Sequence, residues 1–388
     1  MNHNLQQLMR SATQLTQAGR LNEATQTIQR MLRGETAADA APSGPAPAWA
    51  KADAIHVPGG ATPQASPLVL DGCVFEVDAP GPAATAAGTG TFISGTHTHA
   101  SLTRRFKLYT PPHAVGRLLP LVVMLHGCTQ NPDDFAAGTG MNQRAHEQGF
   151  FVLYPEQSQE ANPSRCWNWF KHNHQQRSSG EPALLASMTQ AVMKQHGIDP
   201  QRVFIAGLSA GGAMAAIVAA AYPDIFAAVG VHSGLPSGAA HNVAEALAVM
   251  KNGVAGAPMS ARAGRFGAKS PAPPQPQKQV PTIVFHGDLD QTVHPRNGEQ
   301  VVAAALGKAV GAGARVEQGV SAQGRRYTRS THHCAKGEIL TEHWLVHGAG
   351  HAWAGGLAAG SYTDAKGPDA TQEMLRFFFE HPGQSRAN

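Results

Sequence analysis

The chain has 388 residues, of which 42% are hydrophobic and 14% are charged. This composition allows one large core or two small ones and excludes a chain that is disordered throughout. The formal net charge is +4 and the basic residues are scattered, which argues against a nucleic-acid partner. No apolar stretch reaches the ~20 residues of a membrane helix, so the sequence predicts no transmembrane segment.

The N-terminal part is predicted to lie outside the main domain. Residues 1–33 have the apolar stripes of two short helices broken near Ala18 and Gly19. Such a hairpin cannot bury its own apolar face, so we expect it to dock on the main domain, a second copy or a partner. Residues 34–89 have the Ala/Pro/Gly-rich composition of a linker. The first fifteen residues lack the apolar region of a signal peptide, which predicts a cytoplasmic location.

Residues 90–381 alternate strand-like runs with helical patterns. This alternation predicts an α/β fold with a mostly parallel central sheet and helices on both faces. The expected strands cover 105–109, 119–125, 150–154, 203–206, 227–231, 282–285 and 342–346, and the expected helices 134–148, 182–195, 210–221, 298–306 and 369–379. A low-complexity insert at 236–279, with a short helix at its start, is expected to be a surface excursion rather than a lid.

A serine lies at one strand-to-helix turn, in Gly207-Leu208-Ser209-Ala210-Gly211. In α/β-hydrolases this turn is too tight for side chains, so glycines flank the serine two residues away on either side. A G-x-S-x-G string also arises by chance in a chain with 42 glycines. The strand before it and the helix after it favour Ser209 as a nucleophile.

A serine nucleophile needs a base and an acid that orients the base. The order in this fold is Ser, acid, His. Asp290 follows the strand at 282–285 and is the predicted acid, with Asp288 as the competitor that would only stabilise the turn. His351 lies in a Gly-rich loop after the last strand and is the predicted base, whereas His347 and His294 are weaker candidates.

Two backbone amides commonly form the oxyanion hole. The amide of Ala210 follows the nucleophile, and that of Cys128 lies in the loop after the strand at 119–125. Cys128 is less attractive as a nucleophile, because no separate base is evident for it. Metal chemistry is not expected: the paired histidines lack both the helical spacing and the Cys pairs of zinc sites. The sequence therefore predicts neither a metal nor a cofactor.

Several segments in a fixed order resemble the polyhydroxybutyrate depolymerase family of esterases. These segments lie at 105–111, 126–130, 166–170, 207–212, 232–235, 286–293 and 350–356. The resemblance implies an α/β-hydrolase fold, with Ser209, Asp290 and His351 as the triad and Cys128 in the oxyanion loop. It also suggests that Cys128 and Cys166 pair as a disulfide. The family includes extracellular poly(3-hydroxyalkanoate) depolymerases and feruloyl and acetylxylan esterases.

We therefore expect a serine esterase acting on poly(3-hydroxybutyrate)-type polyester or its oligomers. Trp167, Trp169 and Trp353 flank the predicted site and are candidates for an apolar substrate wall, with filling of the core as the ordinary alternative. The second hypothesis is a feruloyl or acetylxylan esterase, since both types use the same triad. The third, from another class, is an inert hydrolase fold that binds a granule or partner through the hairpin at 1–33.

Overall fold

The computed structural model describes residues 68–70, 73–76, 90–112, 114–254, 279–307, 313–334 and 337–383. All of them belong to one compact unit, Leu68–Asn388. The predicted hairpin at 1–33 lies outside the described residues, as does the part of the insert at 255–278.

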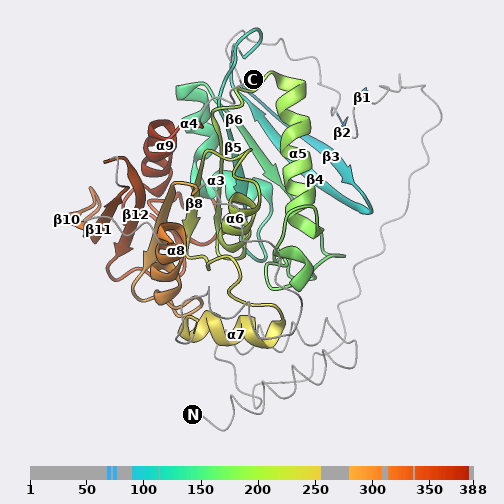
Figure 1. Ribbon diagram of the computed structural model, residues 1–388. Helices are drawn as coiled ribbons and strands as arrows, with labels where there is room; N and C mark the ends of the chain where they lie inside the picture. Colours follow the sequence, from blue (N-terminus) through green and yellow to red (C-terminus); the bar gives the residue numbers. More distant parts are fainter. Residues whose placement is uncertain are drawn as a thin grey trace, which may run out of the picture. The chain divides into compact units, whose positions relative to one another are not determined.

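The described residues form a sheet of twelve strands around which the site is built (Figure 1). Its six central strands are parallel, and antiparallel strands extend both ends. In spatial order the strands are β1 (Leu68–Leu70), β2 (Cys73–Glu76), β3 (Thr91–His99), β4 (Leu102–Thr110), β6 (Phe151–Pro155), β5 (Leu121–Leu125), β7 (Val203–Leu208), β8 (Ala228–His232), β9 (Thr282–Gly287), β12 (Ile339–Val346), β11 (Arg326–His333) and β10 (Arg315–Val320). A separate pair joins β13 (Trp353–Ala354) to β14 (Thr363–Asp364).

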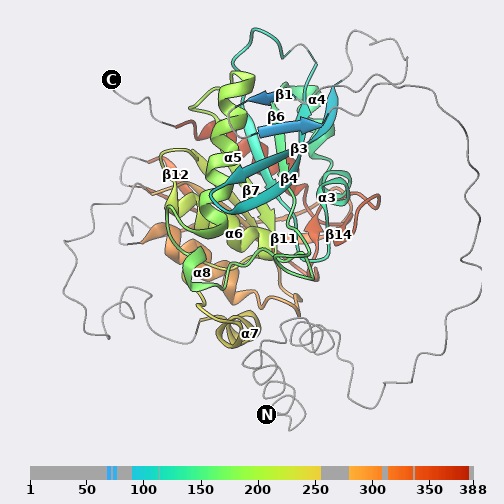
Figure 2. The same ribbon diagram turned by 90° about the vertical axis from the view of Figure 1, so that its right-hand side faces the viewer.

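Helices cover both faces of the sheet, as predicted (Figures 1 and 2). Alternate residues of the buried strand β5 enter different cores, because successive side chains of a strand point to opposite faces. Val123 packs in a core with α5, α6 and α8, whereas Met124 packs with α3, α4 and α9. The helices are α3 (Pro132–Thr139), α4 (Met141–Gln148), the 3-10 turn η1 (His172–His174), α5 (Gly180–His196), α6 (Ala210–Ala221), α7 (Val243–Asn252), α8 (Arg296–Leu306) and α9 (Ala370–Glu380).

The predicted strands and helices of the main domain are confirmed, with three differences. The helix expected at 134–148 is divided into α3 and α4, because Gly140 adopts a left-handed conformation with φ of 64° and caps α3. Strands β3, β10 and β11 and the short pair β13 and β14 were not predicted. Strands β1 and β2 fall within the segment assigned to the linker and pair with the sheet edge. The short helix expected at the start of the insert is α7.

The carboxyl ends of the parallel strands lie together at one edge of the sheet. The pairing register aligns Leu125 with Gly207 and Leu208 with His232. It also aligns Val346 with Gly287 at the ends of β12 and β9. Loops that follow these strands therefore meet at one edge, where ligands bind in open α/β sheets.

Candidate active site

Ser209 lies in the strained turn between β7 and α6. Its φ of 57° and ψ of −120° are unusual for a residue with a side chain. The turn has no room at the flanking glycines: a Cβ on Gly211 would collide with the carbonyl oxygen of Leu125, and one on Gly207 would collide with the backbone of Gly211. The predicted nucleophile elbow thus follows from backbone packing.

Asp290 and His351 lie in contact in the loops after β9 and β12. Asp290 Oδ2 accepts a hydrogen bond from His351 Nδ1 at 2.7 Å. Asp290 Oδ1 accepts from the amides of Thr292 at 2.9 Å and Val293 at 2.8 Å, which fixes the carboxylate. Because the carboxylate only accepts, Nδ1 carries the hydrogen and Nε2 is left to accept a proton. This is the acid–base pair that the sequence predicts.

The Asp290 carboxylate stays ionised in this environment. Its side chain is buried, and burial alone would raise its pKa. The hydrogen bonds from His286 and His351 outweigh burial and hold the pKa of Asp290 well below its usual range. His286 Nε2 lies 3.3 Å from Asp290 Oδ2 and donates to the carbonyl of Val293 at 2.7 Å. His286 therefore helps to keep the Asp290 carboxylate ionised, a role that the sequence did not indicate.

The competing residues make other contacts. Asp288 Oδ2 accepts from His347 Nδ1 at 2.9 Å, and its Oδ1 accepts from the amide of Gly348 at 2.7 Å. Asp288 and His347 thus form a second pair that shapes the same loop. His294 is tied to the insert, since its amide donates to the carbonyl of Met250 in α7 at 2.7 Å. These contacts favour Asp290 as the acid over Asp288, and His351 as the base over His347 and His294.

The loop after β5, which is predicted to supply an oxyanion donor, is held by a disulfide and by hydrogen bonds. Cys128 forms a disulfide with Cys166, the pairing that the family resemblance suggested. The amide of Thr129, whose φ is 66°, donates to the carbonyl of Ser164 at 2.7 Å. Thr129 Oγ1 also lies 3.2 Å from the hydroxyl of the half-exposed Tyr362. In the described part of the chain the amides of Cys128 and Ala210 donate no hydrogen bond, as oxyanion donors require.

His232, at the end of β8, links the serine segment to the histidine loop. The amide of Ser209 donates to the carbonyl of His232 at 2.9 Å. The ring Nε2 of His232 accepts from the amide of Ala354 at 2.9 Å, three residues beyond His351. Burial first, then the neighbouring histidines, hold the pKa of His232 well below its ordinary value, so the ring is neutral. Among the described residues Ser209 Oγ makes no hydrogen bond to His351, and that direct contact stays a prediction.

The three tryptophans predicted to line a substrate wall lie in the core instead. Trp353 is 1% exposed, stacks on the ring of His232 and donates from Nε1 to Thr371 Oγ1 at 3.0 Å. Trp167 and Trp169 are also buried, Trp167 against the ring of His126. The wall prediction was wrong for these residues, because large aromatic side chains gain most by leaving water entirely.

Within the described ranges, no group of three or more His, Cys, Asp or Glu residues is arranged to hold a metal ion. None of the helices in the same ranges has both the length and the apolar character needed to span a bilayer.

Comparison with known proteins identifies the family of the chain. The family model described as esterase PHB depolymerase matches residues 104–322, a stretch that contains Ser209 and Asp290 and ends before His351. Poly(3-hydroxyalkanoate) depolymerase C from Paucimonas lemoignei is 36% identical over 187 residues, covering 47% of this chain and 43% of that protein. A probable acetylxylan esterase A from Aspergillus fumigatus is 29% identical over 188 residues, covering 46% and 48%.

The chain thus spans less than half the length of these two relatives. Among solved structures, an acetyl xylan esterase from Aspergillus awamori superimposes with a TM-score of 0.54 at 18% identity, covering 71% of this chain and 94% of that one. This likeness agrees with the α/β-hydrolase fold expected from the sequence. With the family model matching more than half of its residues, the chain belongs to the esterase PHB depolymerase family.

Proposed function

We propose that this protein is a serine esterase that hydrolyses carboxylic ester bonds, with Ser209 as nucleophile, His351 as base and Asp290 as the acid that orients it. One observation carries the proposal: Asp290 and His351 form a 2.7 Å hydrogen bond at the sheet edge where the strained Ser209 turn ends β7. The relatives of the chain are themselves named as depolymerases and acetylxylan esterases.

The proposed mechanism follows from these positions. His351 Nε2 takes the proton of Ser209 Oγ as the oxygen attacks the ester carbonyl, while Asp290 holds the ring and stabilises its positive charge. The amides of Cys128 and Ala210 stabilise the tetrahedral oxyanion. The intermediate collapses, His351 gives its proton to the departing alcohol, and an acyl-enzyme remains. Water, deprotonated by His351, then releases the acid and restores Ser209.

For the substrate we propose a poly(3-hydroxybutyrate)-type polyester or its oligomers. The support is the 36% identity to a protein named poly(3-hydroxyalkanoate) depolymerase C. The second candidate, a carbohydrate esterase that removes acetyl or feruloyl groups, is supported by the 29% identity to a probable acetylxylan esterase. The same triad can hydrolyse polyesters and acetyl or feruloyl esters, so the shape of the substrate cleft determines which substrate is preferred.

The test compares the wild type with Ser209→Ala on p-nitrophenyl butyrate, amorphous poly(3-hydroxybutyrate), acetylated xylan and methyl ferulate. We expect hydrolysis by the wild type and its loss in the variant, with the polyester preferred. Preference for xylan or ferulate would select the carbohydrate esterase. Equal activity in the two proteins, or activity on no ester, would remove the triad assignment and favour an inert binding protein.

A further inference from the structure

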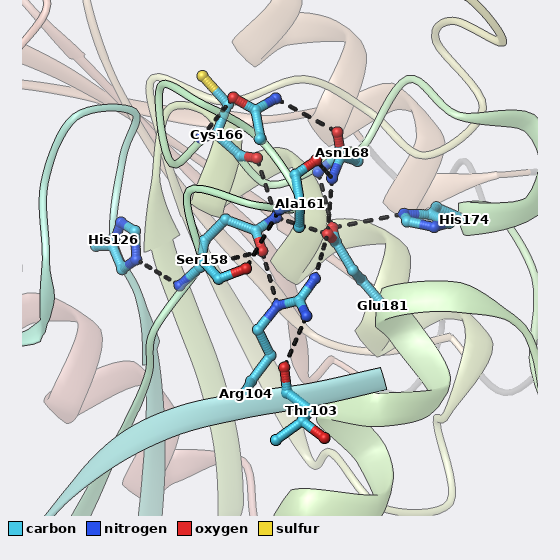
Figure 3. A network of polar contacts seen from close by, with 11 residues as sticks. Thr103, Arg104, His126, Ser158, Ala161, Cys166, Asn168, His174 and Glu181 are labelled. Carbon is cyan, nitrogen blue, oxygen red and sulfur yellow. Dashed lines mark hydrogen bonds and ion pairs between the residues drawn. The ribbon is translucent and has the colours of Figure 1, made fainter. Parts of the chain in front are cut away.

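A buried carboxylate outside the triad lies at the centre of a polar network. Glu181, in the first turn of α5, has no exposed surface. Its Oε1 accepts hydrogen bonds from Gln157 Nε2 at 2.6 Å and from Asn168 Nδ2 at 2.8 Å (Figure 3). Its Oε2 accepts from the amide of Asn168 at 2.8 Å, and Arg104 Nη2 lies 3.5 Å from Oε1. Every polar partner is a donor, so the network requires an acceptor-only group at this position.

The network keeps Glu181 ionised. Burial alone would raise its pKa, but the neighbouring His174, whose Nδ1 lies 3.5 Å from Oε2, and the hydrogen bonds from Gln157 and Asn168 lower it instead. A charge removed from water costs free energy unless it is fully paired. Since the catalytic mechanism uses no group of this network, the buried charge needs another explanation.

One route from Glu181 leads to the oxyanion loop through Gln157 and His126. The amide of Gln157 donates to His126 Nε2 at 3.1 Å, so His126 Nδ1 carries the hydrogen and donates to the carbonyl of Gly127 at 2.8 Å. Burial lowers the pKa of His126 to about 4, and the ring therefore stays neutral in this tautomer near neutral pH. Gly127 immediately precedes Cys128, so this route fixes one side of the Cys128 amide.

A second route runs through the disulfide. Gln157 Nε2 also donates to the carbonyl of Cys166 at 3.0 Å, and Asn168 is held to Glu181 by both its amide and its side chain. Cys166 is bonded to Cys128. Glu181 is thus joined to Cys128 by two chains of contacts, which share Gln157, while Asn168 adds a further link on the Cys166 side.

We propose that Glu181 is a positioning residue that holds the Cys128 amide in the geometry required for the oxyanion. This role rests on the proposed function, which assigns the Cys128 amide to the oxyanion hole. An oxyanion donor is effective only when it is held within about 0.5 Å of its working position before the reaction begins. Loss of the charge at Glu181 loosens both routes and weakens transition-state binding more than substrate binding.

The chain offers a matched control on the other side of the sheet. Glu342 of β12 is equally buried and accepts hydrogen bonds from Arg329 at 2.8 Å and from Arg376 at 2.7 Å. It is also a carboxylate paired with arginine, and none of its recorded partners lies in the oxyanion loop. Glu181→Gln and Glu342→Gln remove the same charge at the same burial, so their difference isolates the effect on the loop.

The experiment measures kcat and KM on p-nitrophenyl butyrate and the inhibition constant of a trifluoromethyl ketone, which forms an oxyanion adduct with an active serine. For Glu181→Gln we expect kcat to fall roughly 10- to 100-fold with KM nearly unchanged, and the inhibitor to weaken by a similar factor. Glu342→Gln should lower the thermal midpoint and leave kcat unchanged. Gln157→Met keeps Glu181 and its contacts with Asn168 but removes the side-chain hydrogen bonds of Gln157 to Glu181 and to the carbonyl of Cys166, so it affects both routes. It should give a smaller fall in kcat and carries the test if Glu181→Gln does not fold.

The outcomes separate this role from the function itself. If the wild type shows Ser209-dependent hydrolysis and both network variants keep its kcat, or lose no more than Glu342→Gln, Glu181 has only a structural role and the inference is overturned. If the wild type hydrolyses no ester, the proposed function fails and this role fails with it. A parallel fall in kcat and in inhibitor affinity, confined to the network variants, supports the inference.

Discussion

His351 and Asp290 are 61 residues apart in the sequence and are joined by a 2.7 Å hydrogen bond between Nδ1 and Oδ2. The bond is short because both residues follow adjacent parallel strands, β12 and β9, whose ends are in register. The carboxylate of Asp290 is also held by hydrogen bonds from the amides of Thr292 and Val293. The ring of His351 is therefore oriented before any substrate arrives.

Asp290→Asn should lower kcat by about 10³- to 10⁴-fold, because an amide no longer enforces the tautomer that leaves Nε2 as the base. The asparagine oxygen can still accept from the amides of Thr292 and Val293, so the loop should stay folded. The control is Asp288→Asn, which alters the neighbouring pair with His347 and should retain most activity. Equal losses in the two variants, measured as kcat, would contradict the assignment of Asp290.

Two glycines near His351 should respond oppositely to alanine. A Cβ on Gly287 would collide with the carbonyl oxygen of Ala349 and push the histidine loop away, whereas a Cβ on Gly350 meets no atom within 4 Å. We expect Gly287→Ala to lower kcat by up to about 100-fold, since a displacement near 1 Å can cost that much. Gly350→Ala should keep near-wild-type kinetics. Similar kinetics in both variants would mean that the loop is not positioned by this contact.

The Cys128–Cys166 bridge should support both stability and catalysis. It closes a loop with a sequence separation of 38, and in the chain-entropy model its removal lowers the free energy of unfolding by about 4 kcal/mol. Cys128→Ala with Cys166→Ala should show that loss in urea unfolding, together with a lower kcat. Cys334→Ala changes a cysteine outside any bridge and serves as the control. Unchanged stability and kcat without the bridge would refute this prediction.

Stability should fall as the pH is lowered from about 6.5 to about 4. The ordinary pKa of histidine is 6.5, and burial lowers that of His126 to about 4. In this window the unfolded chain binds a proton that the folded protein excludes, so the free energy of unfolding decreases, by about 3 kcal/mol from this residue alone. Urea unfolding between pH 7 and pH 4 measures the effect. His126→Asn cannot titrate there and should show a shallower decline, and an identical slope would rule out His126 as the cause.

Trp353 should matter for stability rather than for substrate affinity. Trp353→Phe loses the hydrogen bond to Thr371 and leaves a small void beside His232, which should lower the free energy of unfolding by about 1–3 kcal/mol. KM for p-nitrophenyl butyrate should stay unchanged. A raised KM with unaltered stability would restore the substrate wall predicted from the sequence.

The turn at Ser209 could be predicted because neighbouring residues in the sequence determine its conformation. Ser209 lies between glycines, after a buried strand and before a helix of small residues. This local pattern is typical of one backbone conformation, the tight strand-to-helix turn. Asp290 and His351 were assigned from their order along the chain and their places after strands. The sequence predicted Asp290 but kept Asp288 as a competitor, because which histidine each carboxylate meets across the sheet edge depends on contacts between distant residues.

Other features depend on contacts between distant residues. Glu181 resembles any acidic residue in the first turn of a helix, and its burial arises only when Gln157 and Asn168 surround it. The tryptophans were misplaced because nearness to a loop in the sequence does not tell which way a ring points. Strand β10 was missed because its residues are mostly exposed and carry little alternation of apolar and polar side chains.

The place of His232 has a consequence for motion. Its carbonyl holds the amide of Ser209, and its ring holds the amide of Ala354 in the histidine loop. The serine segment and the histidine loop are therefore attached to the same residue at the end of β8. We expect this shared attachment to limit changes in the distance between the proposed nucleophile, Ser209, and the loop of the proposed base, His351.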